Sequence, residues 1–533
     1  MNGLKWAGCL VLAANFLGNA GSAVEAGQAE KLFRVGVYIY ASPMEKAAAD
    51  ENTPIADFVD KHFKILSDHG VNGVYLGGAG PASLDAYLAA AAKHGIALIP
   101  QLDFAYFRGA WTEDQMDQNA RKAGEFIAKH QNHPMILAWS VKEEVAHNEI
   151  NMLARYYAKI QEFAPGARFN LIHSGLGAAQ DQPVPDPVII GTDRYGFWWE
   201  FSGGGYLASP AAALDWTRTE ASRYYLEAAR RGADYMFVVT QGGFVSVQWA
   251  NALCKNPEET KYPKTPEERR RLQERALAYA KDNRMGWRKV TTDKGDFYAV
   301  WKYYRLPENC IKACAWASVL EGARLFYIWS YTPLSKDRLA EGGIAEMAAG
   351  STTRKSQTWW TMAGRPGMPN RHLEELAETS KEIRAYEKII TRMAKIPGLT
   401  VKADSKQTFG QAFHVPTRPG IVIVLHNANV GTWPEGSRYF FKETDDIRID
   451  DKGDMVGYTP YRDPAPVKFT IPEAMTQAAG KVEGVFDLAT GEEIKPADGA
   501  YVAPVKPGSG RLVFLGARQQ AAQWQALCRQ PGN

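Results

Sequence analysis

Acidic and amide side chains follow several short apolar runs of the sequence. Gln101 and Asp103 come after one such run, Glu143 and Glu144 after another, and Asp193 after a third. Two carboxyl groups that face one another across a cleft can cleave a glycosidic bond, because one protonates the leaving oxygen while the other attacks carbon or activates water. We therefore take Glu144, Asp193, Glu143 and Asp103 as the catalytic candidates.

Aromatic residues are abundant, with 15 Trp, 24 Tyr and 22 Phe, and aromatic side chains with a few placed polar groups commonly line small-molecule sites. The substrate-binding candidates lie after the same apolar runs, and they are Gln101, His173, Tyr195, Trp198, Trp199, Gln241 and Trp329. Structural roles compete with these assignments. Asp103 and Asp193 also suit turns at strand ends, and Trp198 and Trp199 also suit a packed loop.

Other chemistries have no support in the sequence. It contains no nucleophile elbow with a Ser-His-Asp order, no H-E-x-x-H motif and no glycine-rich phosphate loop. We therefore expect no organic cofactor and no metal cluster. The formal net charge of +3, from 62 Lys and Arg against 59 Asp and Glu, is too small to indicate a nucleic-acid partner.

Eight short apolar runs alternate with amphipathic helical stretches. The predicted strands are 34–40, 73–76, 97–102, 135–141, 168–172, 188–192, 235–240 and 324–329. This alternation predicts parallel strands joined by helices, and no G-x-G-x-x-G follows the first run to favour an open dinucleotide-binding sheet. We predict an α/β fold in which residues 30–395 form a (β/α)8 TIM barrel, with the catalytic residues at the C-terminal ends of its strands.

The pattern changes after residue 397. Helical periodicity stops, and short alternating runs separated by turn residues predict a C-terminal all-β sandwich domain over residues 396–517. The tail, 518–533, is expected to be a short helix or disordered. Two insertions, 242–298 and 333–369, follow the seventh and eighth predicted strands, on the face where a barrel builds its active site.

The N-terminus has the order of a secretory signal. Lys5 precedes an apolar run over 6–18, and the small residues Gly21, Ser22 and Ala23 follow, so we predict a signal peptide over 1–23. The apolar run is shorter than a membrane span. We expect a secreted or periplasmic protein with no membrane span. In such a compartment disulfides form, and we expect one between Cys254 and either Cys310 or Cys314.

Four segments together resemble clan-A glycoside hydrolases and their uncharacterised secreted relatives. They are HPMILAWSVKEEV (133–145), VIIGTDRYGF (188–197), GADYMFVVTQGGF (232–244) and GARLFYIWSYTP (322–333), and their order along the chain is that of strands four, six, seven and eight of the family barrel. The resemblance implies that Glu144 is the acid/base residue and that an accessory β-domain follows the barrel.

One departure from the family pattern bears on mechanism. Gln241 stands where the resemblance implies a nucleophilic Glu, and Val145 replaces the usual Pro. Three explanations stay open: an inverting enzyme with Asp193 or Asp103 as base, a nucleophile on another loop such as Glu200, or a barrel that binds sugar without cleaving it. We expect hydrolysis of O-glycosidic bonds in a poly- or oligosaccharide, with Glu144 as general acid. The alternative is a catalytically inactive carbohydrate-binding barrel. The sequence predicts no oligomeric state.

Overall fold

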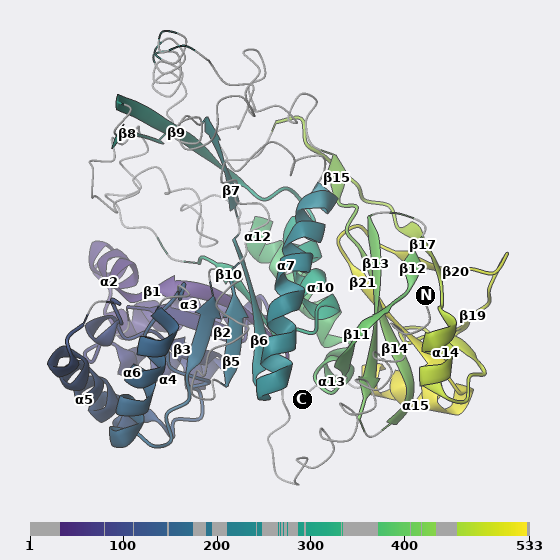
Figure 1. Ribbon diagram of the computed structural model, residues 1–533, viewed down its shortest axis with the longest axis horizontal. Coiled ribbons are helices and arrows are strands. Elements are labelled where there is room, and N and C mark those ends of the chain that lie inside the picture. The colour runs from purple at the N-terminus through teal and green to yellow at the C-terminus, as the bar shows by residue number, and fades with distance from the viewer. Residues whose placement is uncertain are drawn as a thin grey trace, which may run out of the picture.

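The computed structural model describes most of the chain between residues 32 and 529 (Figure 1). The described segments are 32–78, 80–109, 111–145, 149–173, 188–193, 210–240, 242–247, 286–292, 295–331, 371–403, 407–416, 418–432 and 456–529, with the single residues 265, 267, 270, 274, 333 and 405. The predicted signal peptide and the predicted insertion 333–369, apart from residue 333, lie outside them.

A curled parallel sheet of seven strands forms the first half of the molecule. Its order is β3-β2-β1-β10-β6-β5-β4. The strands are β1 (Arg34–Tyr40), β2 (Gly73–Gly77), β3 (Ala97–Pro100), β4 (Asn170–His173), β5 (Ile189–Thr192), β6 (Asp234–Thr240) and β10 (Leu325–Trp329). Seven of the eight predicted strands are therefore confirmed, each within a few residues of its predicted bounds.

The predicted fourth strand is the exception. Residues 136–140 form isolated parallel bridges, with β3 on one side and with Phe169, just before β4, on the other. The Ser140 N–H donates to the Pro100 carbonyl at 2.9 Å, and the Trp139 N–H donates to the Arg168 carbonyl at 2.7 Å. A closed eight-stranded barrel was expected, whereas the structure has a seven-stranded sheet whose two edges are linked by this short segment.

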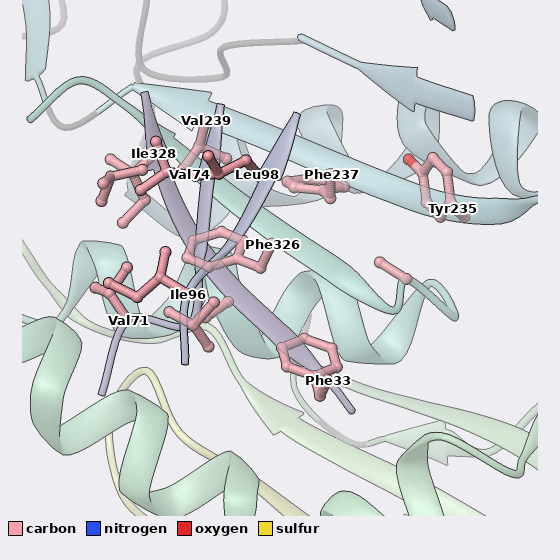
Figure 2. Close-up of a cluster of buried hydrophobic side chains, with 14 of the residues drawn as sticks. Phe33, Val71, Val74, Ile96, Leu98, Tyr235, Phe237, Val239, Phe326 and Ile328 are labelled. Carbon is pink, nitrogen blue, oxygen red and sulfur yellow. The ribbon is translucent and has the colours of Figure 1, made fainter. Parts of the chain in front are cut away.

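Helices cover the outer face of the sheet. They are α2 (Ala41–Asp50), α3 (Ile55–Asp68), α4 (Leu84–His94), α5 (Glu113–His130), α6 (Ile150–Phe163), α7 (Pro210–Arg231), α10 (Cys310–Leu320) and α12 (Arg371–Arg384). Alternate strand residues such as Val74, Leu98 and Phe326 point toward these helices and are fully buried (Figure 2). Helix α5 begins with a capping box, in which Thr112 and Gln115 satisfy one another's backbone N–H groups.

The inner face of the sheet has its own core, and its largest side chains are three tyrosines. Tyr38 stacks on Tyr75 with ring centroids 4.3 Å apart and meets Tyr327 edge-on at 6.4 Å. Glycines opposite make room for these rings, because a Cβ at Gly36 or Gly73 would lie within about 2.5 Å of Tyr327. The remaining residues of this inner core come from the other strands and from 136–140: Ile99, Ala138, Ile172, Ile189, Met236, Val238 and Leu325.

A second, antiparallel sheet of three strands lies beyond the C-terminal end of β6 (Figure 1). It has the order β7-β9-β8, with β7 (Gly242–Val247), β8 (Gly286–Thr292) and β9 (Gly295–Arg305). The sequence prediction treated this stretch as an insertion without strands. The β-branched and aromatic residues of 287–304 were the signal that could have revealed the β8–β9 hairpin.

The C-terminal part of the chain forms further antiparallel sheets. A six-stranded sheet has the order β11-β13-β14-β21-β18-β19, and a three-stranded sheet has the order β12-β17-β20. The strands are β11 (Ala394–Thr400), β12 (Lys402–Ala403), β13 (Thr408–Val415), β14 (Arg418–Asn427), β17 (Ala465–Thr470), β18 (Gly484–Asp487), β19 (Glu493–Ile494), β20 (Tyr501–Val505) and β21 (Gly510–Gly516). Two further short strands, β15 (Gly431–Thr432) and β16 (Thr459–Pro460), pair with each other.

Strand β14 shows why these sheets pack as layers. Ile421, Ile423 and Leu425 join a core shared with the three-stranded sheet, whereas Val422 and Val424 join the main core on the opposite side. The period of two in the side chains thus buries both faces of the strand. Helices α13 (Glu387–Ile390), α14 (Glu473–Ala479) and α15 (Arg518–Arg529) complete this region, so the predicted tail is helical up to Arg529.

Two further findings concern the predicted compartment. No helix in the described part of the chain is long and apolar enough to cross a bilayer. The predicted disulfide is wrong, because Cys310 and Cys314 are both free thiols buried on α10. The helix packs them into the core beside Glu375 of α12, and burial raises the pKa of the Cys310 thiol. Cys254 lies outside the described residues.

Candidate active site

The candidate residues that the structure places lie together at the C-terminal ends of the parallel strands. Because side chains alternate along a strand, residues two positions beyond an inner-core residue also face the inner side. Gln101 follows Ile99 in this way, and Trp329 follows Tyr327. A Cβ at Gly191 would contact Met236 and Ile172 of the inner core, so Asp193, two residues later, also emerges on that side.

Glu144 and Asp193 form the centre of the site. Their carboxyl groups interact directly, although the residues come from separate loops after 136–140 and β5. Two carboxyl groups this close do not both ionise freely, because their charges repel. The structure thus brings together Glu144 and Asp193, both of which are catalytic candidates from the sequence.

The environments of the two carboxyl groups differ. Asp193 is only 7% exposed, whereas Glu144 is exposed. Burial raises the pKa of the Asp193 carboxyl well above its usual value, and the neighbouring Glu144 and Glu143 raise it further. Burial and the two neighbouring glutamates thus favour the protonated form of Asp193.

Glu143 is a third member of the cluster. Its carboxyl group is half-buried and lies near the Tyr38 hydroxyl. Burial, with the charges of Glu144 and Asp103, raises the pKa of Glu143 to about 7, while the nearby Tyr38 hydroxyl acts in the opposite direction. Glu143 thus exchanges its proton near neutral pH, a property that suits acid–base catalysis.

Asp103 and Gln101 lie at the end of β3. Asp103 begins the short helix η1 (Asp103–Ala105) and is exposed. Partial desolvation raises the pKa of its carboxyl, against the lowering effect of Arg108. Gln101 is 7% exposed, and its Oε1 accepts no hydrogen bond from the described residues. A buried acceptor in this state is suited to bind a hydroxyl donor.

Trp329 is the last residue of β10 and lies at the same end of the sheet. Its ring is half-buried, and its Nε1 donates a hydrogen bond to the Tyr40 hydroxyl at 2.8 Å. Tyr40 is the last residue of β1 and pairs in register with Gly77 of β2. A Cβ at position 77 would lie 2.6 Å from the Tyr40 ring, so a glycine is needed to accommodate the ring there.

The remaining candidates are not all placed. His173 is the last residue of β4 and pairs with Thr192 of β5, but its side chain lies outside the described part of the structure. Tyr195, Trp198, Trp199, Gln241 and Glu200 lie wholly outside the described residues. Within the described residues, no group of three or more His, Cys, Asp and Glu is arranged to hold a metal ion.

Sequence reasoning missed two tyrosines that contact the cluster. Tyr38 lies on β1 within the run Tyr38-Ile39-Tyr40, where the period of two already indicates that both tyrosines share a face. Tyr106 follows η1 and contacts the backbone of Glu143. No pattern in the sequence distinguishes Tyr106 from any other loop tyrosine.

The raised pKa of Glu143 predicts how stability depends on pH. The folded protein keeps this proton up to about pH 7, whereas an ordinary glutamate loses it near 4.5. The folded state therefore binds more protons within this window, and rising pH favours unfolding. Relative to the Glu143→Gln variant, the wild-type protein should lose free energy of unfolding between these two pH values. Urea unfolding of both proteins across this pH window measures the difference. If the free energies of unfolding of the two proteins changed with pH in the same way, the raised pKa of Glu143 would be contradicted.

Comparison with known proteins identifies no family. No protein-family model matches the chain, and no curated protein matches it. Among solved structures, a β-glucuronidase from Ruminococcus gnavus is 16% identical over 39% of this chain and 35% of its own, with a TM-score of 0.31. A GH2 β-galacturonidase from Eisenbergiella tayi is 14% identical over 66% of this chain and 51% of its own, with a TM-score of 0.36.

A third neighbour is AmyP in complex with maltose, which is 8% identical over 90% of this chain and 96% of its own, with a TM-score of 0.42. The neighbours thus include glycoside hydrolases, and the chain spans about a third of the length of the glucuronidase that it matches. Identities and TM-scores this low decide neither the fold nor the reaction. The function must therefore be inferred from the residues of the site.

Proposed function

We propose that this protein hydrolyses O-glycosidic bonds in a poly- or oligosaccharide. The observation that supports the proposal is the interacting pair of Glu144 and Asp193 at the C-terminal ends of the strands, in which burial raises the pKa of the Asp193 carboxyl well above its usual value. Cleavage of a glycosidic bond needs a proton donor that still holds its proton near neutral pH, next to a second carboxyl group.

The environments of the pair suggest a role for each member. Asp193 donates its proton to the glycosidic oxygen as the bond from that oxygen to the anomeric carbon breaks. Glu144 either attacks the anomeric carbon or takes a proton from the water that attacks it. In both routes the leaving sugar gains the proton and the other sugar gains the hydroxyl of water. Gln101 and Trp329 would then hold the sugar beside the pair.

The pair must separate when substrate binds. Carboxyl groups in contact are closer than the roughly 5–5.5 Å of retaining enzymes or the roughly 6.5–9.5 Å of inverting enzymes. Glu144 is the exposed member, so its side chain can turn away from Asp193 while the backbone of its loop keeps its place. The separation in a complex with a sugar would decide between retention and inversion.

Several finer expectations belong to the same proposal. We propose that residues 136–140 act as the eighth strand of a (β/α)8 barrel over 30–395, since they already bond to both edges of the sheet. We also propose a sandwich domain over 396–517, and secretion directed by residues 1–23. N-terminal sequencing of the exported protein would test the predicted cleavage after Ala23.

A panel of purified poly- and oligosaccharides tests the activity. The wild-type protein should release reducing sugar from at least one glycan, and Glu144→Gln should abolish the release. Glu113→Gln serves as a matched control, because Glu113 pairs with Arg155 on the exposed start of α5. Tight sugar binding without release by the wild type would support the carbohydrate-binding alternative. Absence of both binding and release across the panel would contradict both functions.

A further inference from the structure

The Tyr106 hydroxyl contacts both backbone polar groups of Glu143. It accepts a hydrogen bond from the Glu143 N–H at 3.3 Å and donates one to the Glu143 carbonyl at 3.3 Å. A single side chain thus satisfies the donor and the acceptor of one peptide segment, which the fold must otherwise pair elsewhere. Burial raises the pKa of Tyr106, so the hydroxyl keeps the proton that it donates.

The bonds lie midway along the loop that carries both glutamates. At the start of this loop, the Phe107 N–H donates to the Val141 carbonyl at 2.7 Å, and at its end the Val145 N–H donates to the Ile172 carbonyl at 3.0 Å. Glu144, between these anchors, has a φ of +51°. A non-glycine residue adopts this left-handed conformation only when its surroundings enforce it.

The Tyr106 ring is itself fixed. Lys142 Nζ lies 5.5 Å from the centre of the ring and is held at 3.1 Å from Glu149 Oε1. The cation restrains the ring face, and the hydroxyl consequently has a defined position beneath Glu143. Removing the hydroxyl while keeping the ring isolates its two hydrogen bonds.

We propose that Tyr106 is a positioning residue of the site, whose hydroxyl holds the 141–145 loop so that Glu143 reaches Tyr38 and Glu144 reaches Asp193. This inference rests on the proposed function for its kinetic consequence, but not for its structural one. Without the hydroxyl, the loop relaxes, Glu143 leaves its desolvated place beside Tyr38, and the Glu144–Asp193 contact loosens.

Tyr106→Phe is the test variant. We expect kcat to fall roughly 10²-fold, the cost of a misplacement of about 1 Å, with KM nearly unchanged. The pKa of Glu143 should fall from about 7 toward its usual value. The charges of Glu144 and Asp103 and the Tyr38 hydroxyl act on the pKa of Glu143, and Asp193 and Tyr75 also lie close enough to Glu143 to interact with it. Isotope-edited infrared titration of the glutamate carboxyl groups measures the shift without any substrate.

Tyr157→Phe is the matched control. The Tyr157 hydroxyl donates to the Asn170 carbonyl at 3.1 Å, at the start of β4 and away from the C-terminal strand ends that carry the site. The Tyr157→Phe variant should leave both kcat and the Glu143 titration unchanged. A Tyr106→Phe protein that keeps the Glu143 pKa near 7 overturns the inference. If the wild type proves inactive, the proposed function fails, but the infrared titration still decides the role of Tyr106.

Discussion

Asp193→Asn should lower kcat/KM by roughly 10²–10⁴-fold on natural glycans, the range contributed by a positioned general acid. Asparagine matches the shape of aspartic acid but has no acidic proton to deliver, whereas burial raises the pKa of Asp193 and favours its protonated form. The loss should shrink for aryl glycosides whose leaving group departs without protonation. Steady-state kinetics on natural and activated substrates measure both effects.

The companion variant separates the two roles. Glu144→Gln removes the group that attacks carbon or activates water, and leaving-group acidity cannot replace that function. It should therefore be equally inactive on natural and activated substrates. If an activated leaving group rescues Glu144→Gln rather than Asp193→Asn, then Glu144 is the proton donor of the pair and the assignment to Asp193 is wrong.

Glu321→Ala should lower the free energy of unfolding by about 3–5 kcal/mol, the cost of breaking a buried ion pair by removing one partner. Glu321, 1% exposed, follows α10 and accepts a hydrogen bond from Arg218 of α7 at 2.8 Å. It also pairs with Lys395 of β11, which is itself buried. The variant therefore leaves buried Lys395 without its carboxylate, and leaves Arg218 with Asp215 alone, at the junction of the helices and the six-stranded sheet.

Urea unfolding of Glu321→Ala, compared with Asp68→Ala, checks this expectation. Asp68 pairs with Lys64 on an exposed helix face, where ion pairs contribute little because water screens them. The Asp68 variant should unfold at almost the wild-type midpoint. Equal midpoints for the two variants would mean that the buried triad does not hold α7, α10 and β11 together.

The strands of the parallel sheet were predictable because both of their faces are buried. Runs such as 34–40 and 324–329 are apolar on each face, and this pattern depends on local sequence alone. Residues 135–141 show the same apolar pattern but form only isolated bridges. Apolar content indicates burial, and it does not specify how many backbone hydrogen bonds a segment makes to its neighbours.

The identity of the candidate acids was also accessible, because strand ends in such folds carry polar residues. The pKa shifts of these acids could not be predicted from the sequence. The pKa of Asp193 is raised because of how deeply the folded chain buries its carboxyl and because Glu144 interacts with it, and both causes arise from residues distant in the sequence. The contribution of Tyr106 depends in the same way on a contact across 37 positions, which no local pattern encodes.

The protonation state of Asp193 tests the proposed catalytic pair most directly. Isotope-edited infrared spectra of the wild-type protein at neutral pH, compared with Asp193→Asn, isolate the carboxyl band of this residue. We expect Asp193 to be protonated at pH 7 and to lose its proton only in more alkaline solution. An Asp193 carboxylate that is already ionised at neutral pH, and titrates like an exposed aspartate, would contradict the pair.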